Sequence, residues 1–329
     1  GIRDLVRSRE LGDVYKRQTI HTSYDPNKEI IVTVGGSEAI DLTIRCLIQP
    51  GDEVLIVEPS FVCYRPIVSL CGGVPVVIET KEENEFRLTA DELREKITDK
   101  TKLLVLPYPN NPTGAIMRRE DLEAIAKVLK DTNIMIASDE IYSELTYSGK
   151  HCSIAEIEGM RERTIVINGF SKSFAMTGWR LGFLGGPKEI VSQMLKLHQY
   201  AIMSSPTVSQ YAAIVAMHSC QKDIDAMRNE YNIRRRFVVD SFNKLGLKCF
   251  APQGAFYVFP CIKSTGMTST DFCEKLVYTK KVAVVPGDAF GECGEGYVRV
   301  SYAYSLNHLR EAIKRIGEFL EDIKNGNVQ

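Results

Sequence analysis

The chain has 329 residues, of which 44% are hydrophobic and 25% are charged, and this composition is close to the average of soluble globular proteins. A single hydrophobic core stops growing beyond roughly 250–300 residues, so the length predicts about two domains. The formal net charge of −1 gives no electrostatic reason to expect nucleic acid or an anionic membrane as a partner, and a small-molecule substrate is the default expectation.

The first 18 residues differ in character from those that follow. The segment GIRDLVRSRELGDVYKRQ contains eight charged residues and does not lead into the pattern of the later chain. It resembles translated adapter or vector sequence more than the start of a native domain, so residues 1–18 are left out of the fold prediction. The alternative interpretation is an ordinary amphipathic helix with one solvated face.

From about residue 29, short β-rich runs alternate with helical patterns. Strands are expected at residues 30–34, 53–57, 74–78, 102–106, 134–138, 164–168 and 180–184. Helices are expected between them, for example at residues 38–47, 89–97, 119–129 and 188–198. Alternation of this kind predicts an α/β fold, in which a mostly parallel sheet is sandwiched by helices.

The rhythm changes after a long helix with a polar face, which is expected at about residues 223–245. Two later runs, at residues 254–259 and 281–285, are expected to be strands of a smaller α+β unit. We therefore predict a large domain at residues 19–230 and a small C-terminal domain at residues 231–329. No apolar run approaches the roughly 18 residues that a membrane-spanning helix needs, so no membrane partner is expected.

The cysteines and histidines give no metal-binding pattern. No two of the nine cysteines have the C-x-x-C spacing that is typical of zinc or redox sites. The five histidines form no H-E-x-x-H or similar ligand pattern, so no metal is expected. An odd number of scattered cysteines favours reduced thiols in a cytoplasmic protein over a secreted disulfide framework.

Polar residues follow three of the expected strands, at the point where each strand ends. The strand at 102–106 leads into a Pro-Asn-Asn-Pro-Thr-Gly segment that contains Asn111, and the strand at 134–138 leads to Asp139 and Tyr142. The strand at 164–168 leads to Lys172. Because ligands bind outside the carboxyl ends of strands in open α/β sheets, these side chains are expected to face one crevice.

A glycine turn adds a candidate anion site. Gly35-Gly36-Ser37-Glu38 follows the first expected strand and opens a helix, where free backbone N–H groups and the helix dipole favour an anion such as phosphate. Arg180, which lies eight residues after Lys172, offers a planar guanidinium for the same anion. Taken alone, each of these features has an ordinary structural interpretation as a turn, a helix cap or a surface side chain.

Four ordered segments together give a specific resemblance. Residues 169–182, GFSKSFAMTGWRLG, resemble the pyridoxal-lysine motif of class I/II aminotransferases, which depend on pyridoxal 5′-phosphate (PLP). The segments NNPTG at 110–114, SDEIY at 138–142 and YVRVSY at 297–302 are similar to the other motifs of that family, in the same order. The resemblance runs from about residue 24 to the C-terminus, and it implies the PLP-dependent transferase fold of type I.

The resemblance implies roles for individual residues around the cofactor ring. Lys172 would carry PLP as a Schiff base and, when displaced by substrate, would move the proton between Cα and the cofactor. Asp139 would keep the pyridine nitrogen protonated, and Asn111 and Tyr142 would bind the phenolic oxygen. Phe61 would stack on the ring. By the same resemblance, the peptide bond between Asn111 and the following proline is expected to be cis.

Further residues are expected to bind the two anionic groups. Ser37 and Glu38 would offer backbone N–H groups to the cofactor phosphate, and Arg180 would complete that site. Arg299 would bind the substrate α-carboxylate in a bidentate pair, with Asn111 close to the substrate as well. Some relatives that use aspartate have a lysine where this chain has Ser37, so alanine, methionine or aromatic donors are favoured over aspartate.

The implied activity is a ping-pong transamination between an L-amino acid and a 2-oxo acid, and family members are homodimers. One alternative is a PLP-dependent lyase of the same fold. Another is a non-catalytic PLP-fold effector domain joined to a DNA-binding module, although no helix-turn-helix or basic arm is visible. Full-length relatives begin with a longer N-terminal segment that residues 1–18 do not match, so an inactive or poorly active truncated fragment is the remaining alternative.

Overall fold

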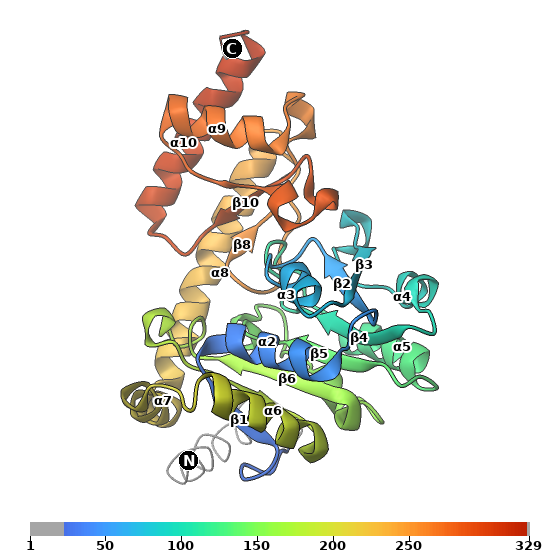
Figure 1. The fold of residues 1–329 in the computed structure, drawn as a ribbon. Coiled ribbons are helices and arrows are strands. Elements are labelled where there is room, and N and C mark those ends of the chain that lie inside the picture. Colours follow the sequence, from blue (N-terminus) through green and yellow to red (C-terminus); the bar gives the residue numbers. More distant parts are fainter. Residues whose placement is uncertain (1–22, 328–329) are drawn as a thin grey trace.

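A seven-stranded sheet forms the centre of the larger part of the molecule (Figure 1). The computed structural model describes residues 23–327. The sheet has the strand order β1-β7-β6-β5-β4-β2-β3, in which only β7 runs antiparallel to its neighbours. The strands are β1 (Ile30–Thr33), β2 (Glu53–Glu58), β3 (Val74–Glu79), β4 (Thr101–Leu106), β5 (Met135–Asp139), β6 (Thr164–Gly169) and β7 (Gly182–Gly185). The prediction of a mostly parallel sheet is thus confirmed.

Helices cover both faces of this sheet because its buried strands are apolar on both sides. In β4, Leu103 and Val105 join one hydrophobic cluster, whereas Leu104 and Leu106 join another. The first cluster is covered by α2 (Gly35–Leu47), α3 (Tyr64–Leu70) and α6 (Lys188–Ala201), and the second by α4 (Ala90–Lys96) and α5 (Arg119–Leu129). Side chains that alternate between two faces are the period-2 pattern of a strand.

A smaller unit follows the sheet and has its own core. It contains α9 (Ser269–Lys280), α10 (Leu306–Lys324) and an antiparallel sheet of order β8-β10-β9, formed by β8 (Tyr257–Val258), β9 (Val285–Pro286) and β10 (Val298–Ser301). Phe272 and Phe319 meet edge to face in this core, with ring centroids 5.2 Å apart. The two expected strands at 254–259 and 281–285 are therefore present but much shorter than predicted.

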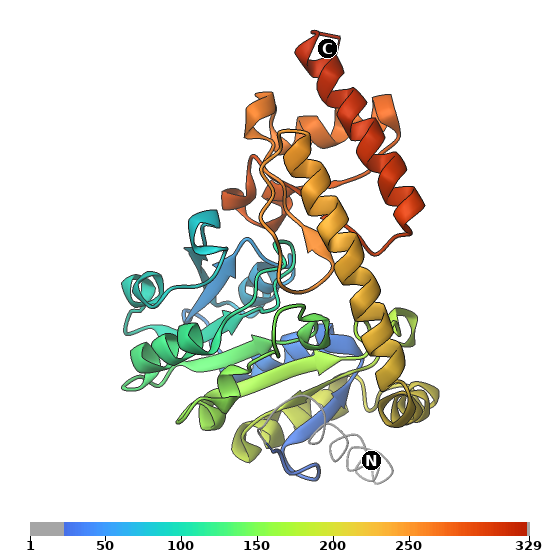
Figure 2. The same ribbon diagram turned by 180° about the vertical axis from the view of Figure 1, so that it is seen from behind.

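One long helix, α8 (Gln221–Lys244), connects the two parts of the molecule. Figure 2 shows it running from α7 (Thr207–Ser219) beside the large sheet up to the smaller unit. The expected division at residue 230 falls inside this continuous helix, so the domain boundary stays a prediction. The expected leader at residues 1–18 lies outside the described residues. Within residues 23–327, no helix is both long and apolar enough to cross a membrane.

A close approach of two backbone segments fixes one corner of the sheet. A Cβ atom placed on Gly182, the first residue of β7, would lie only 2.6 Å from the carbonyl carbon of Gly35 at the start of α2. Gly35 itself has φ +78°, a conformation that side chains disfavour. Strand β7 begins two residues later than the predicted start at Arg180, because Arg180 has φ 49° and belongs to the preceding turn.

Candidate active site

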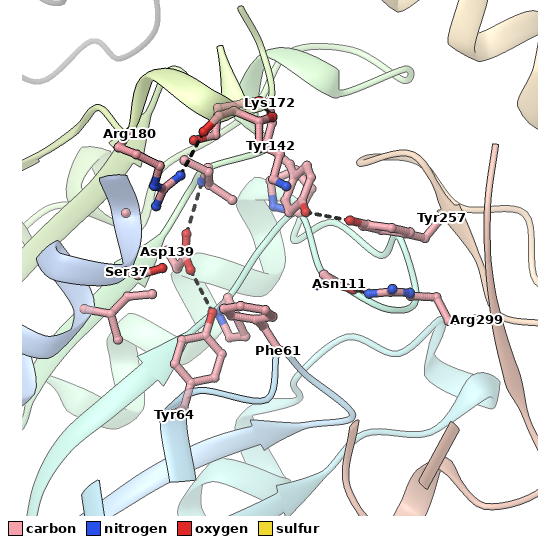
Figure 3. A pocket seen from close by; sticks show the side chains of 17 residues that line it. Ser37, Phe61, Tyr64, Asn111, Asp139, Tyr142, Lys172, Arg180, Tyr257 and Arg299 are labelled. Carbon is pink, nitrogen blue, oxygen red and sulfur yellow. Dashed lines mark hydrogen bonds between the residues drawn. The ribbon is translucent and has the colours of Figure 1, made fainter. Parts of the chain in front are cut away.

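The carboxyl ends of the parallel strands meet at one pocket (Figure 3). Asp139 is the last residue of β5, Asn111 follows β4, and Lys172 follows β6. Eight of the nine predicted site residues line this pocket, namely Ser37, Phe61, Asn111, Asp139, Tyr142, Lys172, Arg180 and Arg299. The expectation of a common crevice is met by geometry, and the functional roles of these residues remain predictions.

The ninth residue, Glu38, does not line the pocket with its side chain. Its Oε1 atom lies 2.6 Å from Nδ1 of His198 on α6, and its Oε2 atom accepts a hydrogen bond from the backbone N–H of Val34. Its backbone N–H belongs to the first residues of α2, and its predicted role in binding an anion stays a prediction.

Lys172 is the amine of the pocket. Burial lowers its pKa, and the positive charges of Arg299 and Arg180 lower it further, while Asp139 opposes the shift. Its Nζ atom lies 5.9 Å from the ring centroid of Tyr142 and 5.8 Å from that of Phe256. A lowered pKa increases the fraction of neutral amine at a given pH, and only the neutral amine is a nucleophile or a base.

Asp139 is a buried carboxylate with two hydrogen-bond donors. The hydroxyl of Tyr64 donates to Oδ2 at 2.7 Å, and the backbone N–H of Ile141 donates to Oδ1 at 3.2 Å. Burial raises the pKa of Asp139, whereas these two donors lower it. Tyr64 was not predicted from the sequence. The available signal was its position three residues after Phe61, at the first residue of the helix that follows β2.

The turn that carries Asn111 is held by its neighbour. The Oδ1 atom of Asn110 accepts hydrogen bonds from the backbone N–H of Thr113 at 3.1 Å and from the Thr113 hydroxyl at 2.8 Å. The predicted cis bond between Asn111 and Pro112 is wrong: in this loop the cis bond precedes Pro109, and the Asn110 side chain closes the turn around a trans Asn111–Pro112 bond.

Arg299 reaches the pocket from β10 of the smaller sheet. Its Nη1 atom donates to Oδ1 of Asn111 at 2.9 Å, and its guanidinium carbon lies 4.6 Å from the ring centroid of Tyr257 and 4.8 Å from that of Phe290. The two rings fix the plane of the guanidinium. Among the described residues, its buried Nε has no hydrogen-bond partner. A buried donor without a partner is costly, and an incoming carboxylate would satisfy it.

Tyr142 is paired with a second tyrosine that was not predicted. The hydroxyl groups of Tyr142 and Tyr257 lie 3.0 Å apart, and Figure 3 shows Tyr257 on the Arg299 side of the pocket. Burial raises the pKa of Tyr142 well above its usual range. Its hydroxyl therefore stays protonated and is available as a hydrogen-bond donor. Tyr257 lies in the expected strand at 254–259, but nothing in that pattern marked it as a site residue.

The end of the pocket that lies opposite Arg299 is suited to a phosphate (Figure 3). Gly36 and Ser37 at the start of α2 line it, together with Ser171, Thr177 and Arg180. A Cβ on Gly35 would lie 2.6 Å from Nη2 of Arg180, so the guanidinium lies directly against the turn. Ser171 and Thr177 were missed, although both lie inside the lysine motif. Backbone N–H groups, hydroxyls and a guanidinium together are a typical phosphate-binding set.

The charged and hydrogen-bonding groups of the pocket match those that PLP requires. An aldehyde needs a neutral amine, a form that the lowered pKa of Lys172 favours, and a protonated pyridine nitrogen needs a buried carboxylate such as Asp139. A phenolic oxygen needs donors such as the Tyr142 hydroxyl, and the phosphate needs the N-terminal turn of α2 with Arg180. The unpaired Nε of Arg299 remains for a carboxylate.

Comparisons with known proteins agree with this geometry. The family model described as aminotransferase class I and II matches residues 8–316. The aspartate aminotransferase of Pyrococcus abyssi is 48% identical over 303 residues, which cover 91% of this chain and 78% of the relative. The aromatic-amino-acid aminotransferase 2 of Thermococcus litoralis is 46% identical over 303 residues, covering 91% of this chain and 78% of the relative.

A solved structure shares the fold as well. The crystal structure of the aromatic aminotransferase from Pyrococcus horikoshii OT3 superimposes with a TM-score of 0.94 and 44% sequence identity, and the match covers 97% of this chain and 86% of that chain. Agreement in sequence family, fold and the pocket's donor set leads to one conclusion. The chain belongs to the class I and II aminotransferase family and is a PLP-dependent aminotransferase.

Proposed function

We propose that this aminotransferase moves the amino group of an L-amino acid with an uncharged side chain to a 2-oxo acid, with Lys172 as the covalent anchor of PLP. The observation that carries the proposal is the neighbourhood of Lys172, an amine of lowered pKa in a pocket that also holds Asp139, Arg180 and Arg299. When bound, PLP supplies a conjugated ring that takes up the electrons released at the substrate Cα.

Asp139 holds the proton on the pyridine nitrogen in this proposal. Its charge is maintained by the Tyr64 hydroxyl and the Ile141 N–H, which already occupy part of its hydrogen-bonding capacity. Tyr142 and Asn111 donate hydrogen bonds to the phenolic oxygen. Phe61, which meets Tyr64 edge to face at 6.2 Å, stacks against the ring. The ring is thereby held from its edges and one face.

The phosphate is bound by the backbone N–H groups of Ser37 and Glu38 together with the Arg180 guanidinium. Arg180 is oriented for this task by the turn that precedes it, because its Nη1 atom donates to the carbonyl oxygen of Thr177 at 3.0 Å. With these residues holding the phosphate and Phe61 against the ring, the amine of Lys172 and the part of the pocket near Arg299 would remain for the substrate.

Arg299 binds the substrate α-carboxylate and orients the Cα–H bond towards Lys172. Contacts with the rings of Tyr257 and Phe290 hold the guanidinium in one orientation before the substrate arrives, so less conformational entropy is lost on binding. Once the substrate amine has displaced it from the cofactor, the neutral amine of Lys172 would accept the proton from Cα and deliver it to the C4′ atom. When the 2-oxo acid enters, its carbonyl oxygen would leave as water as it takes up the amino group, and Lys172 would move the proton in the opposite direction, from C4′ to Cα.

The expected preference for a donor with an uncharged side chain follows from the charged residues that line the pocket. Among the described residues that line the pocket, the charged ones are Asp139, Lys172, Arg180 and Arg299, and each already has a role in the proposal. No cation is left for a side-chain carboxylate, and Ile40, Phe61 and Tyr64 supply apolar walls. An uncharged side chain is therefore preferred, because an unpaired buried charge is costly.

A donor panel tests this preference. Alanine, methionine and phenylalanine should each exceed aspartate in kcat/KM by about tenfold when 2-oxobutyrate, whose side chain is uncharged, is the acceptor. The measurement is the loss of the bound cofactor's visible absorbance on donor addition, followed by quantification of the new amino acid. Aspartate as the best donor would overturn the preference, and release of ammonia in place of nitrogen transfer would favour lyase chemistry.

We further propose a cytoplasmic homodimer. Several large apolar side chains are exposed on α6, on α7 and between them, including Tyr200, Met203, Val208 and Val215. This corner lies at the opposite end of the molecule from α9 and α10 (Figures 1 and 2). Clustered exposed apolar residues are typical of interfaces. The nine free cysteines support a reducing compartment.

A further inference from the structure

A hydrogen-bonded pair of a carboxylate and an imidazole lies directly behind the turn at the start of α2. His198 is buried and Glu38 is largely buried, with side chains 6% and 11% exposed, and Glu38 Oε1 lies 2.6 Å from His198 Nδ1. His198 is in the last turn of α6, and its side chain reaches α2 across a sequence separation of 160 residues. A buried carboxylate is costly unless it is paired, so His198 is the partner that makes this position tolerable for Glu38.

The other oxygen of Glu38 holds the turn itself. Oε2 accepts a hydrogen bond from the backbone N–H of Val34, the N-cap residue of α2. The next residues, Gly35, Gly36 and Ser37, form the turn that lies against Arg180 and lines the pocket. One carboxylate therefore links the turn to α6, with Val34 on one oxygen and His198 on the other.

The turn at the start of α2 and Arg180 together form the proposed phosphate site, which we call the cradle. The Arg180 side of the cradle is held by a separate hydrogen bond. The hydroxyl of Ser209, on α7, donates to the carbonyl oxygen of Trp179 at 2.7 Å, and Trp179 precedes Arg180. The two halves of the cradle are thus held from two different helices. Loss of His198 should disturb the α2 half and leave the Arg180 half in place.

We propose that His198 is a positioning residue for phosphate binding, acting through Glu38 on the backbone N–H groups of the turn. The inference rests on the proposed function, in which those N–H groups bind the PLP phosphate. N–H groups bind an anion well only when their direction is fixed before the anion arrives. His198 touches neither cofactor nor substrate in this account, so its effect is confined to ligands that carry the phosphate.

The test compares PLP with pyridoxal, which lacks the phosphate, by fluorescence of the single tryptophan, Trp179. His198→Leu removes the donor, and His198→Asn retains a donor close to the Nδ1 position. Gln193→Ala, an exposed position on the same helix, is the matched control. If His198→Leu does not fold with Glu38 unpaired, the double variant Glu38→Gln/His198→Leu removes both the carboxylate and the imidazole and keeps an oxygen acceptor for the backbone N–H of Val34.

His198→Leu should weaken PLP binding by about tenfold, the effect that loss of an orienting partner has at other ligand sites. Affinity for pyridoxal should stay within about twofold of wild type, a change of less than half a kcal/mol. His198→Asn should recover most of the PLP affinity, and Gln193→Ala should change neither ligand. The same PLP-specific loss is expected in the double variant.

Equal losses for PLP and pyridoxal would show a general structural effect and overturn the inference alone. Unchanged PLP affinity in both His198→Leu and the double variant would overturn it as well. If the wild-type protein itself bound pyridoxal as tightly as PLP, the phosphate site in the proposed function would be wrong, and the inference would fall with it. The wild-type comparison therefore separates the two failures.

Discussion

Asp139 and Lys172 illustrate how neighbouring side chains set the protonation of a site. Burial disfavours charge on both, raising the pKa of Asp139 and lowering that of Lys172. The donors around Asp139 favour its anion, and the two arginines near Lys172 favour its neutral amine. The donors around Asp139 thus oppose the effect of burial on its pKa, whereas the arginines near Lys172 add to it, and both influences favour the ionised carboxyl and the neutral amine that the proposed chemistry requires.

Tyr64→Phe tests the first half of this statement. Loss of the hydroxyl removes a hydrogen bond that lowers the pKa of Asp139, so the pKa should rise in the variant. The acidic limb of the kcat/KM profile should then move to higher pH, because Asp139 becomes protonated sooner as the pH falls. A pH–rate profile of both proteins measures this. An unchanged acidic limb would mean that Tyr64 does not tune Asp139.

The motif residues were predictable one by one, but their partners were not. Asn111, Asp139 and Lys172 were found because each follows an expected strand and belongs to a family motif. Tyr64 meets Asp139 across 75 residues of sequence, and Tyr257 meets Tyr142 across 115. Such pairs depend on how strands and helices pack, and spacing along the chain does not reveal them.

At the scale of elements, strands with apolar runs were predicted best. The sheet strands were located to within two residues, because buried parallel strands are apolar on both faces and are bounded by polar turns. In the smaller unit, β8 and β9 have only two residues each, and extended loop flanks them, so the predicted strands there were too long. The spacing of apolar residues indicates which side chains are buried, but it does not indicate at which residue the hydrogen bonds between neighbouring strands end.

Gly182→Ala tests the contact between β7 and α2. The new methyl group would lie 2.6 Å from the carbonyl carbon of Gly35, and overpacking of this kind destabilises a protein by about 1–3 kcal/mol. Denaturant unfolding measures the free energy change, and PLP affinity should fall as the turn shifts. Gly178→Ala is the control, because a Cβ there has no neighbour within 4 Å. Equal stability of the two variants would contradict this account of the corner.

At the scale of the molecule, the pocket joins both parts of the chain. Arg299 from the smaller sheet bonds Asn111 from the loop after β4, and Tyr257 from the same sheet bonds Tyr142. Arg299, the proposed partner of the substrate carboxylate, therefore comes from the smaller unit, and the proposed cofactor-binding residues come from the large sheet and its loops. The sequence predicted two units with a boundary at residue 230. In the structure the continuous helix α8 joins the two units and includes that position.

Met203→Asp tests the proposed homodimer. Met203 is 76% exposed between α6 and α7, and its φ of 69° is one that aspartate tolerates. A charge in an apolar interface should dissociate the dimer, which light scattering after size-exclusion chromatography detects. Tyr278→Asp, an equally exposed position on α9, is the control. A wild-type monomer, or a Met203→Asp dimer as tight as wild type, would contradict the assignment of this surface.

The most direct test of the central claim is the site of covalent attachment. Protein incubated with PLP is reduced with borohydride, which fixes any link between a lysine amine and the PLP aldehyde, and is then digested and weighed by mass spectrometry. The account predicts a phosphopyridoxyl group on Lys172 in the wild-type protein and its absence, together with nearly all turnover, in Lys172→Ala. Attachment at another lysine, or a retained adduct and retained turnover in Lys172→Ala, would contradict it.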